Sequence, residues 1–241
     1  MPKQLPNCLV NLMKVELNML SEALAPGSCC HPDICPNLTL SLHQLAESLG
    51  NAVDAKDPTT RRHSEEVAAI SHVLALRMGL TAREAEMIHI AGHLHDIGKI
   101  GVPEAVLHKP GPLTPAEWRM VRLHPVIGAD IVRPVKAMAG SGGIAQIILH
   151  HHERHDGSGY PAGLAGQDIP LGARIIAVAD SLSAMMQERP YKPPKGLAES
   201  LAEIASLAGA HYDPRVVEVL LVSEDFVRVC LTPETSRAAR G

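Results

Sequence analysis

Apolar residues recur along this chain at helical spacing, and the alternation typical of β-strands is absent over most of its length. One stripe follows a candidate helix cap at Asn37 and consists of Leu38, Leu42, Leu45 and Leu49. A second stripe follows His63 and consists of Val67, Ile70 and Leu74. Because residues three and four apart share one face of an α-helix, we expect these faces to be buried and the fold to be all-α.

Two helix starts are marked by capping boxes. Thr81 precedes Glu84 by three residues, and Thr114 precedes Glu117 by three. In this pattern the threonine hydroxyl accepts a hydrogen bond from the backbone and the glutamate reaches back to the cap residue. Pro115 stands at the first helical position, which tolerates its missing N–H. We therefore predict helices that begin directly after Thr81 and Thr114.

A proline- and cysteine-rich stretch, PGSCCHPDICPN at residues 26–37, separates the beginning of the chain from the rest. We predict a short N-terminal helical appendage with its linker at residues 1–36, followed by one large domain at residues 37–225. Residues 226–241 are predicted to form a C-terminal tail, since they end in the polar run TPETSRAARG.

Two further breaks lie inside the large domain. The segment AGSGG at residues 139–143 precedes a predicted helix that ends in three consecutive histidines. The segment RPYKPPKG at residues 189–196 carries prolines at a spacing that excludes a helix, so it is predicted to be a rigid basic loop.

Composition and charge narrow the classes of function. One Trp and one Phe among 241 residues leave the core to aliphatic side chains, which suits packed helices. The net charge of −4 gives no basic field for a polymeric nucleic acid, so an anionic ligand has to be met by local charge or metal. Residues 9–20 are too polar to span a membrane, and no membrane association is expected.

The five cysteines do not form a disulfide framework, and no signal peptide is evident at the N-terminus. The motif CCHPDIC at residues 29–35 lacks common zinc-ligand spacing, which favours free thiols over a structural zinc site. The expected location is a reducing cytoplasm.

The chemistry of the chain is concentrated in two motifs. HLHDIGK contains the adjacent pair His95 and Asp96, and HHERHDGSGYP runs from residue 151 to residue 161. His63, His124 and Asp180 add further imidazole and carboxylate groups. These are ligands that first-row transition metals accept, and two metals close together activate water and neutralise phosphate charge. The combination points to a metal-dependent phosphodiesterase.

From about residue 51 to residue 221, these motifs and their order resemble the HD-GYP family of the HD phosphohydrolase superfamily. Also similar are the segments NAVDAKDPTTRRHSEEV, EWRMVRLHPVIGADI and RPYK. The resemblance implies an all-helical HD-domain bundle that holds two or three metals. It also implies hydrolysis of the bacterial messenger cyclic di-GMP to the linear dinucleotide or onward to GMP.

Carried over residue by residue, the resemblance implies two metal-binding sets that share one carboxylate. The first set comprises His63, His95, Asp96 and Asp180, and the second comprises Asp96, His124, His151 and His152. Asp96 would be the catalytic bridge. The expected cofactors are two divalent transition metals, Fe or Mn first, with Ni, Zn and Co as alternatives.

Substrate contacts are expected from basic and loop residues. Lys99 stands one helical turn after Asp96, where its ammonium could reach a phosphate oxygen or the nucleophile, so it is also a catalytic candidate. The remaining candidates are Gly159, Tyr160, Arg189 and Lys192. Arg189 and Lys192 would supply the positive charge that the chain as a whole lacks.

Several positions depart from the family pattern. Thr59 replaces a glutamate that accompanies a third metal, which favours two metals, and Arg62 replaces a glycine beside the first ligand. Ser183, Met186 and Gln187 replace polar residues near the substrate. A receptor for cyclic di-GMP, a protein-interaction module, and a phosphohydrolase for another cyclic dinucleotide or nucleotide therefore stay open. A homodimer or a regulatory protein partner stays open as well.

The other histidines are given structural roles. His72, His89, His93 and His108 match no ligand position in the family pattern, and we expect them at the surface or in helix packing. His150 is the first of three consecutive histidines, and its place relative to Glu153 makes His151 and His152 the ligating pair.

Overall fold

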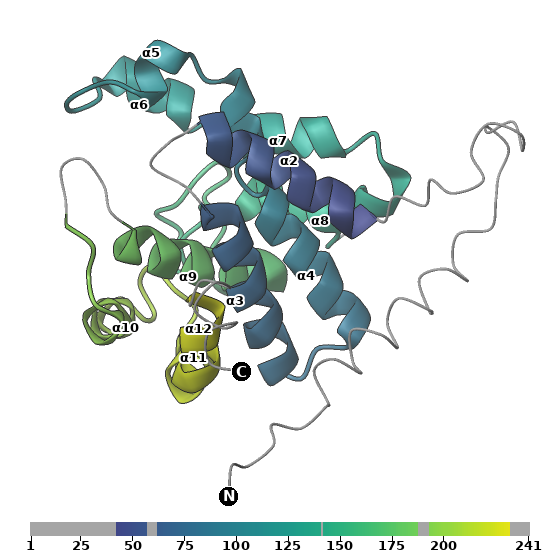
Figure 1. The fold of residues 1–241 in the computed structure, drawn as a ribbon, viewed down its shortest axis with the longest axis vertical. Coiled ribbons are helices and arrows are strands. Elements are labelled where there is room, and N and C mark those ends of the chain that lie inside the picture. Colours follow the sequence, from purple (N-terminus) through teal and green to yellow (C-terminus); the bar gives the residue numbers. More distant parts are fainter. Residues whose placement is uncertain (1–41, 57–61, 141, 188–192, 232–241) are drawn as a thin grey trace, which may run out of the picture. The chain divides into compact units, whose positions relative to one another are not determined.

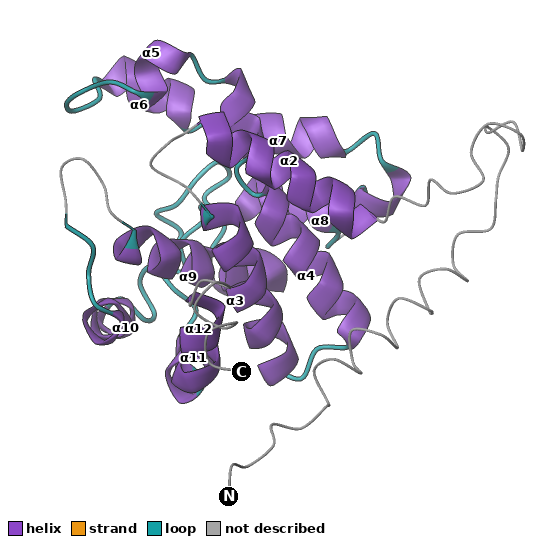
Figure 2. Cartoon of the chain, viewed as in Figure 1, coloured by secondary structure: helices purple, strands orange, loops and turns teal. Residues whose placement is uncertain are grey.

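The computed structural model describes residues 42–56, 62–140, 142–187 and 193–231. Within these ranges the chain forms α-helices and short 3₁₀ helices without a β-strand, which confirms the all-α prediction (Figure 2). The elements are α2 (Leu42–Lys56), α3 (His63–Arg77), α4 (Ala82–Leu94), η1 (Ile97–Gly101), α5 (Glu104–Leu107), α6 (Pro115–Val121), α7 (His124–Val132), η2 (Lys136–Met138), α8 (Ile144–His150), η3 (Gly166–Asp168), α9 (Leu171–Met186), α10 (Leu197–Ser206), α11 (Pro214–Val222) and α12 (Glu224–Leu231).

Some sequence predictions fall outside the described residues. These are the N-terminal appendage at residues 1–36, the cap at Asn37, the cysteine motif at residues 29–35, Thr59, and the basic residues Arg189 and Lys192. None of the helices in the described ranges is both long and apolar enough to cross a bilayer.

Helix α3 lies at the centre of the domain and packs against α4 and α9 (Figure 1). Its predicted apolar stripe, Val67, Ile70 and Leu74, is fully buried. Helix α9 adds Ile175 and Ile176 to the same core, which is aliphatic as the composition predicts. Helices α7 and α8 pack against each other, and α8 also contacts α4 and α9, the two helices that pack on α3.

The predicted apolar stripe on α2 is wrong at Leu45 and Leu49, whereas Leu42 packs against the core and Leu38 lies outside the described residues. Leu45 and Leu49 are 41% and 39% exposed, whereas Ala46, Gly50 and Val53 are buried. The buried face consists of small residues because α2 lies very close to α4: a Cβ atom at Gly50 would lie 2.6 Å from the carbonyl oxygen of His93. Leucine spacing predicted the helix correctly but selected the wrong face.

Both predicted capping boxes are present. The amide of Glu84 donates to the Thr81 hydroxyl, and the Glu84 carboxylate accepts from the Thr81 amide at 2.8 Å. Thr114 and Glu117 form the same pair of bonds at the start of α6. Helix α8 begins after the glycine-rich segment at residues 139–143, also as predicted.

Helices α10, α11 and α12 complete the domain against α9 and α3. The buried carboxylate of Asp213 accepts from the amide of Arg215 at the start of α11 and lies 2.5 Å from the guanidinium of Arg174 on α9. The predicted boundary between residues 225 and 226 falls inside α12, where Val227 is fully buried. Residues 226–231 thus belong to the helical domain because α12 packs on α3.

Arg62 precedes α3 with a φ of 65°, a left-handed conformation that glycine adopts freely and other residues adopt at a cost. This explains why glycine is usual there in the pattern that the chain resembles. The arginine side chain donates to Glu65 at 2.9 Å, and Asp54 accepts from the amide of Ser64 at 3.0 Å. These two contacts hold the strained turn directly before His63.

Element η1 lies directly against α7 at Gly98. A Cβ atom at Gly98 would lie 1.9 Å from the carbonyl oxygen of His124 and 2.5 Å from the amide nitrogen of Gly128. Both obstacles are backbone atoms, which cannot turn away as a side chain can. The absence of a side chain at position 98 therefore brings Asp96, two residues earlier, next to His124.

We predict that Gly98→Ala lowers the free energy of unfolding by at least about 1–3 kcal/mol, the usual cost of forcing extra atoms into a packed interior. Gly140→Ala is the matched control, because no atom lies within 4 Å of a Cβ at that position. Urea unfolding of both variants checks the expectation. A Gly98 variant as stable as the wild type would show that η1 and α7 separate easily.

Candidate metal centre

The predicted ligands lie mainly at helix ends. His63 and His124 are the first residues of α3 and α7, whereas His95 and His151 directly follow α4 and α8. Asp180 projects from the middle of α9. Helix ends of different elements can converge on one point, as they do here, so residues far apart in sequence become neighbours.

The first group consists of His63, His95 and Asp180. One ligand atom from each lies within 4.8 Å of the other two. The Nε2 atom of His63 lies 3.1 Å from a carboxylate oxygen of Asp180. His95 is fully buried and its Nε2 atom forms no hydrogen bond. Such an unsatisfied buried nitrogen needs a partner, and a metal ion is one that imidazole accepts.

The second group consists of His124, His151 and His152. The Nε2 atom of His124 lies 3.4 Å from that of His151 and 3.1 Å from that of His152. Three imidazole nitrogens thus converge on one small volume, which is the donor set of many transition-metal sites.

Asp96 joins the two groups. Its Oδ2 atom lies 3.3 Å from His95 Nε2, and its Oδ1 atom lies 3.3 Å from His124 Nε2. One carboxylate therefore presents one oxygen to each histidine group. This is the arrangement that a bridging ligand between two metals requires.

Hydrogen bonds to Nδ1 orient the imidazoles. The Nδ1 atoms of His95, His124 and His151 each donate to a backbone carbonyl three residues earlier, at 2.8, 2.7 and 2.6 Å. In a neutral imidazole a proton on Nδ1 leaves the lone pair on Nε2, the atom that faces the cluster. The positions of these imidazoles and the tautomer of their neutral rings therefore both fit the binding of divalent transition metals.

The electrostatics of the candidate centre favour positive charge, carried by a proton or by a metal ion. Burial lowers the pKa of His152 to about 3, so its imidazole is neutral near pH 7. Burial opposes ionisation of Asp96, but Lys99, with its Nζ 2.6 Å away, and the neighbouring histidines outweigh burial and hold the pKa of Asp96 well below its ordinary value. Burial likewise lowers the pKa of His95, yet the charge of Asp96 outweighs it and raises that pKa to about 9, so His95 carries a proton near pH 7 that a bound metal ion would have to displace. The site attracts positive charge.

Of the three consecutive histidines, His151 and His152 belong to the second group and His150 does not. His150 is turned away from the cluster, with its Nδ1 3.4 Å from a carboxylate oxygen of the buried Glu153. Glu153 also accepts hydrogen bonds from the amides of Ala162 and Gly163, at 2.7 and 3.1 Å. Glu153 thus ties the following glycine-rich loop to the end of α8.

Within that loop, Gly159 and Tyr160 have different surroundings. A Cβ atom at Gly159 would lie 2.3 Å from the amide nitrogen of Arg154, so the loop closes only without a side chain there. The ring of Tyr160 lies 5.0 Å from that of His152, which places the phenol beside the metal centre.

Ser183 orients a ligand, a role that the sequence did not reveal. Its hydroxyl oxygen lies 2.9 Å from His63 Nδ1 and donates to Glu66 at 2.7 Å. Gln187 adds a contact to the same glutamate at 3.4 Å. The fully buried Ser183 therefore belongs to the support of the metal centre and does not contact the pocket. Only the spacing of three residues from Asp180 on one helix face could have indicated this.

A cavity of about 280 Å³ adjoins the centre. His151, His152 and Asp180 form one part of its wall, and Tyr160 forms another. Two cationic residues, Arg122 and Arg154, also line it. Sequence reasoning missed both arginines, although Arg122 stands two residues before His124 and its guanidinium lies 5.1 Å above the Tyr160 ring.

Comparison with known proteins identifies the family to which the chain is similar. The HD domain family model matches residues 47–216. A cyclic di-GMP phosphodiesterase of Thermotoga maritima is 45% identical over 183 residues, which cover 76% of this chain and 50% of that protein. A 3'3'-cGAMP-specific phosphodiesterase of Vibrio cholerae is 39% identical over 74% of this chain and 34% of that protein. The chain thus spans half or less of the length of these relatives.

A crystal structure of a cyclic GMP-AMP specific phosphodiesterase from Vibrio cholerae is similar in fold, with a TM-score of 0.61 at 20% identity over 83% of this chain and 53% of that chain. The family match spans most of the chain and includes every candidate ligand described above. The chain therefore belongs to the HD domain family, and its resemblance to the HD-GYP group is confirmed.

Proposed function

We propose that this chain hydrolyses a phosphodiester bond of cyclic di-GMP, giving the linear dinucleotide, GMP or both, with a pair of divalent transition metals. The observation that carries the proposal is the position of Asp96, whose two oxygens each lie 3.3 Å from a different histidine group. The relatives named for cyclic dinucleotide hydrolysis support the choice of substrate class.

The proposed ligands are those predicted from the sequence. His63, His95 and Asp180 would hold one ion, His124, His151 and His152 would hold the other, and Asp96 would bridge them. When bound, such a pair lowers the pKa of a water molecule and neutralises charge on the phosphate and the leaving oxygen. Imidazole and carboxylate together suit Fe or Mn, and Ni, Zn or Co are alternatives.

The chain's own side chains would bind and orient the phosphodiester. Arg122 and Arg154 line the cavity and can donate paired hydrogen bonds to phosphate oxygens. Lys99 holds positive charge beside Asp96. Burial, together with the charges of Asp180 and Asp96, raises the pKa of Tyr160, which therefore keeps its proton and serves as a hydrogen-bond donor rather than a base.

The cavity size limits how the substrate fits. Ligand pockets usually measure roughly 300–1,000 Å³, so a cavity of about 280 Å³ accommodates part of a cyclic dinucleotide. The scissile phosphate and one nucleoside would lie inside, and the other nucleoside would lie toward solvent. Gly159, Arg189 and Lys192 stay proposed contacts, as the sequence predicts.

Product analysis tests the proposal against its alternatives. Protein reconstituted anaerobically with Fe²⁺ or Mn²⁺ is incubated with cyclic di-GMP and, separately, with 3'3'-cGAMP, and the products are separated by chromatography. Cleavage of cyclic di-GMP supports the proposal, whereas cleavage of 3'3'-cGAMP alone moves the substrate to that nucleotide. Metal-loaded protein that binds but cleaves neither is a receptor.

We predict that Asp96→Ala lowers metal content from about two ions per chain and abolishes turnover, because Asp96 presents one oxygen to each histidine group. His108→Ala is the control, since His108 is exposed and bonds only to the Lys56 carbonyl and the nearby Glu104. Elemental analysis and product formation are measured on both variants. Equal metal content in the two would refute the bridge.

A second variant tests the support of His63. Ser183→Ala removes the hydroxyl that contacts His63 Nδ1, and the expected result is a loss of roughly 10–100-fold in metal affinity, the usual effect of deleting such a partner. Ser206→Ala is the control, because that hydroxyl bonds only to a backbone carbonyl on α10. Competition with a metal-binding dye gives the affinities, and no difference would remove Ser183 from the centre.

Arg122→Ala tests the cavity. Losing a charged, paired hydrogen bond to phosphate costs roughly 1.5–3 kcal/mol, so kcat/KM should fall roughly ten- to a hundredfold while metal content stays unchanged. Arg119→Ala is the matched control, because Arg119 lies on α6 three residues before Arg122 and does not line the cavity. Equal kinetics for the two variants would show that substrate binds elsewhere.

A further inference from the structure

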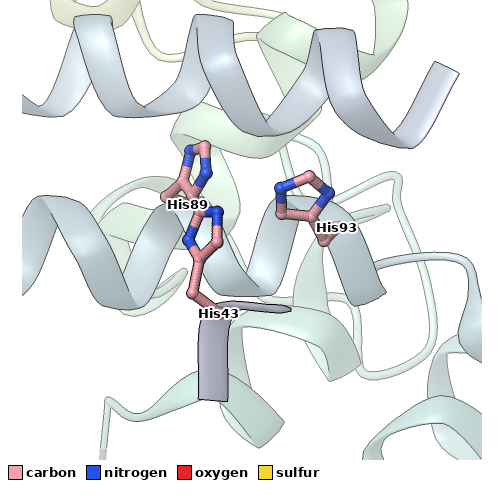
Figure 3. Close-up of side chains that lie close together, drawn as sticks. All are labelled: His43, His89 and His93. Atoms are coloured by element: carbon pink, nitrogen blue, oxygen red, sulfur yellow. The ribbon is translucent and has the colours of Figure 1, made fainter. Parts of the chain in front are cut away.

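A second histidine cluster lies outside the centre described above. It consists of His43 at the start of α2 and His89 and His93 on α4, and Figure 3 shows the three rings gathered where these helices meet. One ring nitrogen of each lies within 4.8 Å of the other two. The cluster shares no residue with the groups around Asp96.

We propose that His43, His89 and His93 form a separate binding site for one divalent transition metal ion, which would join α2 to α4. From the sequence we expect His89 and His93 at the surface or in helix packing. Helix packing alone does not explain the polar groups that surround these two side chains. The proposal does not depend on the substrate of the chain.

Two of the three rings have hydrogen bonds at Nδ1 that favour the tautomer needed for metal binding through Nε2. The Nδ1 atom of His43 donates to a carboxylate oxygen of Glu86 at 3.1 Å, and the Nδ1 atom of His89 donates to the carbonyl of Ala68 at 3.0 Å. Each bond leaves the lone pair on Nε2 when the ring is neutral. A carboxylate or carbonyl behind a histidine is the partner that metal-binding histidines usually have.

The imidazole rings of the cluster also lie in direct contact with one another. The rings of His43 and His89 are stacked at 4.8 Å, and His93 meets both edge-on. His72 on α3 meets His89 edge-on as well, and its buried Nδ1 atom has no hydrogen-bond partner. Four imidazoles and the Glu86 carboxylate therefore lie close together. In the described residues, few other protein groups are placed to form hydrogen bonds with them.

The ligand class follows from the donors. Neutral imidazole suits Zn²⁺, Ni²⁺, Co²⁺ and Cu²⁺ better than Mg²⁺ or Ca²⁺, which prefer oxygen. Burial is the main cause that lowers the pKa of His89 to about 3, which keeps this ring neutral. Two nitrogens on one tetrahedral zinc lie about 3.4 Å apart, and each lone pair lies in its ring plane, so the stacked rings of His43 and His89 have to rotate toward the ion. His43, with 37% of its side chain exposed, has room to do so.

The test counts ions on the 241-residue chain. Metal-free wild type and His43→Ala are titrated with Zn²⁺, passed through a desalting column and analysed for zinc. We expect the variant to hold one ion fewer than the wild type, whatever the total. His108→Ala, a histidine that also bonds to a carbonyl and lies near a glutamate, should hold as many ions as the wild type. The measured quantity is the difference in zinc content between wild type and His43→Ala. If the two-metal proposal is wrong, the zinc content of both proteins changes, but the expected difference of one ion does not.

A milder variant guards against misfolding. Glu86→Gln keeps the shape of the side chain and weakens the bond to His43, so zinc affinity at this site should fall roughly 10–100-fold. Circular dichroism of the metal-free proteins shows whether each variant folds. Equal zinc content in wild type and folded His43→Ala overturns the proposal, and if that variant does not fold, unchanged affinity in Glu86→Gln overturns it.

Discussion

The structure of the centre depends on one constraint, the close approach of η1 to α7 at a residue without a side chain. Gly98 allows backbone atoms of the two elements to touch, and this contact sets the Asp96 carboxylate between His95 and His124. The remaining candidate ligands lie beside His95 and His124, and they come from the ends of α3 and α8 and from the side of α9. The contact between the two backbones thus determines where one carboxylate can lie between both histidine groups.

Orientation of the ligands depends on hydrogen bonds to the backbone rather than on other side chains. His95, His124 and His151 each bond through Nδ1 to a carbonyl of the preceding helical turn. These acceptors are fixed by the helices themselves, so the imidazole faces are oriented as soon as the helices form. His63 is the exception, because its Nδ1 atom lies 2.9 Å from the hydroxyl oxygen of Ser183, a side chain, rather than from a backbone carbonyl.

Sequence reasoning predicted what local chemistry encodes. Capping boxes at Thr81 and Thr114 and the motifs around Asp96 and His151 are short-range patterns, and the structure reproduces the elements and juxtapositions that they imply. It selected the wrong face of α2, because close helix contact selects small residues that a search for leucines overlooks. It also missed Arg122, since only tertiary packing turns an exposed arginine after α6 toward the cavity.

The origin of the ligands from five helices has a consequence for folding. Ions held by α3, α4, α7, α8 and α9 would cross-link segments from most of the domain, and the unfolded chain does not hold these groups together. Binding free energy then becomes folding free energy, and it grows with the logarithm of the free metal concentration. A chelator would act as a denaturant, and the lifetime of the domain would follow the metal supply of its surroundings.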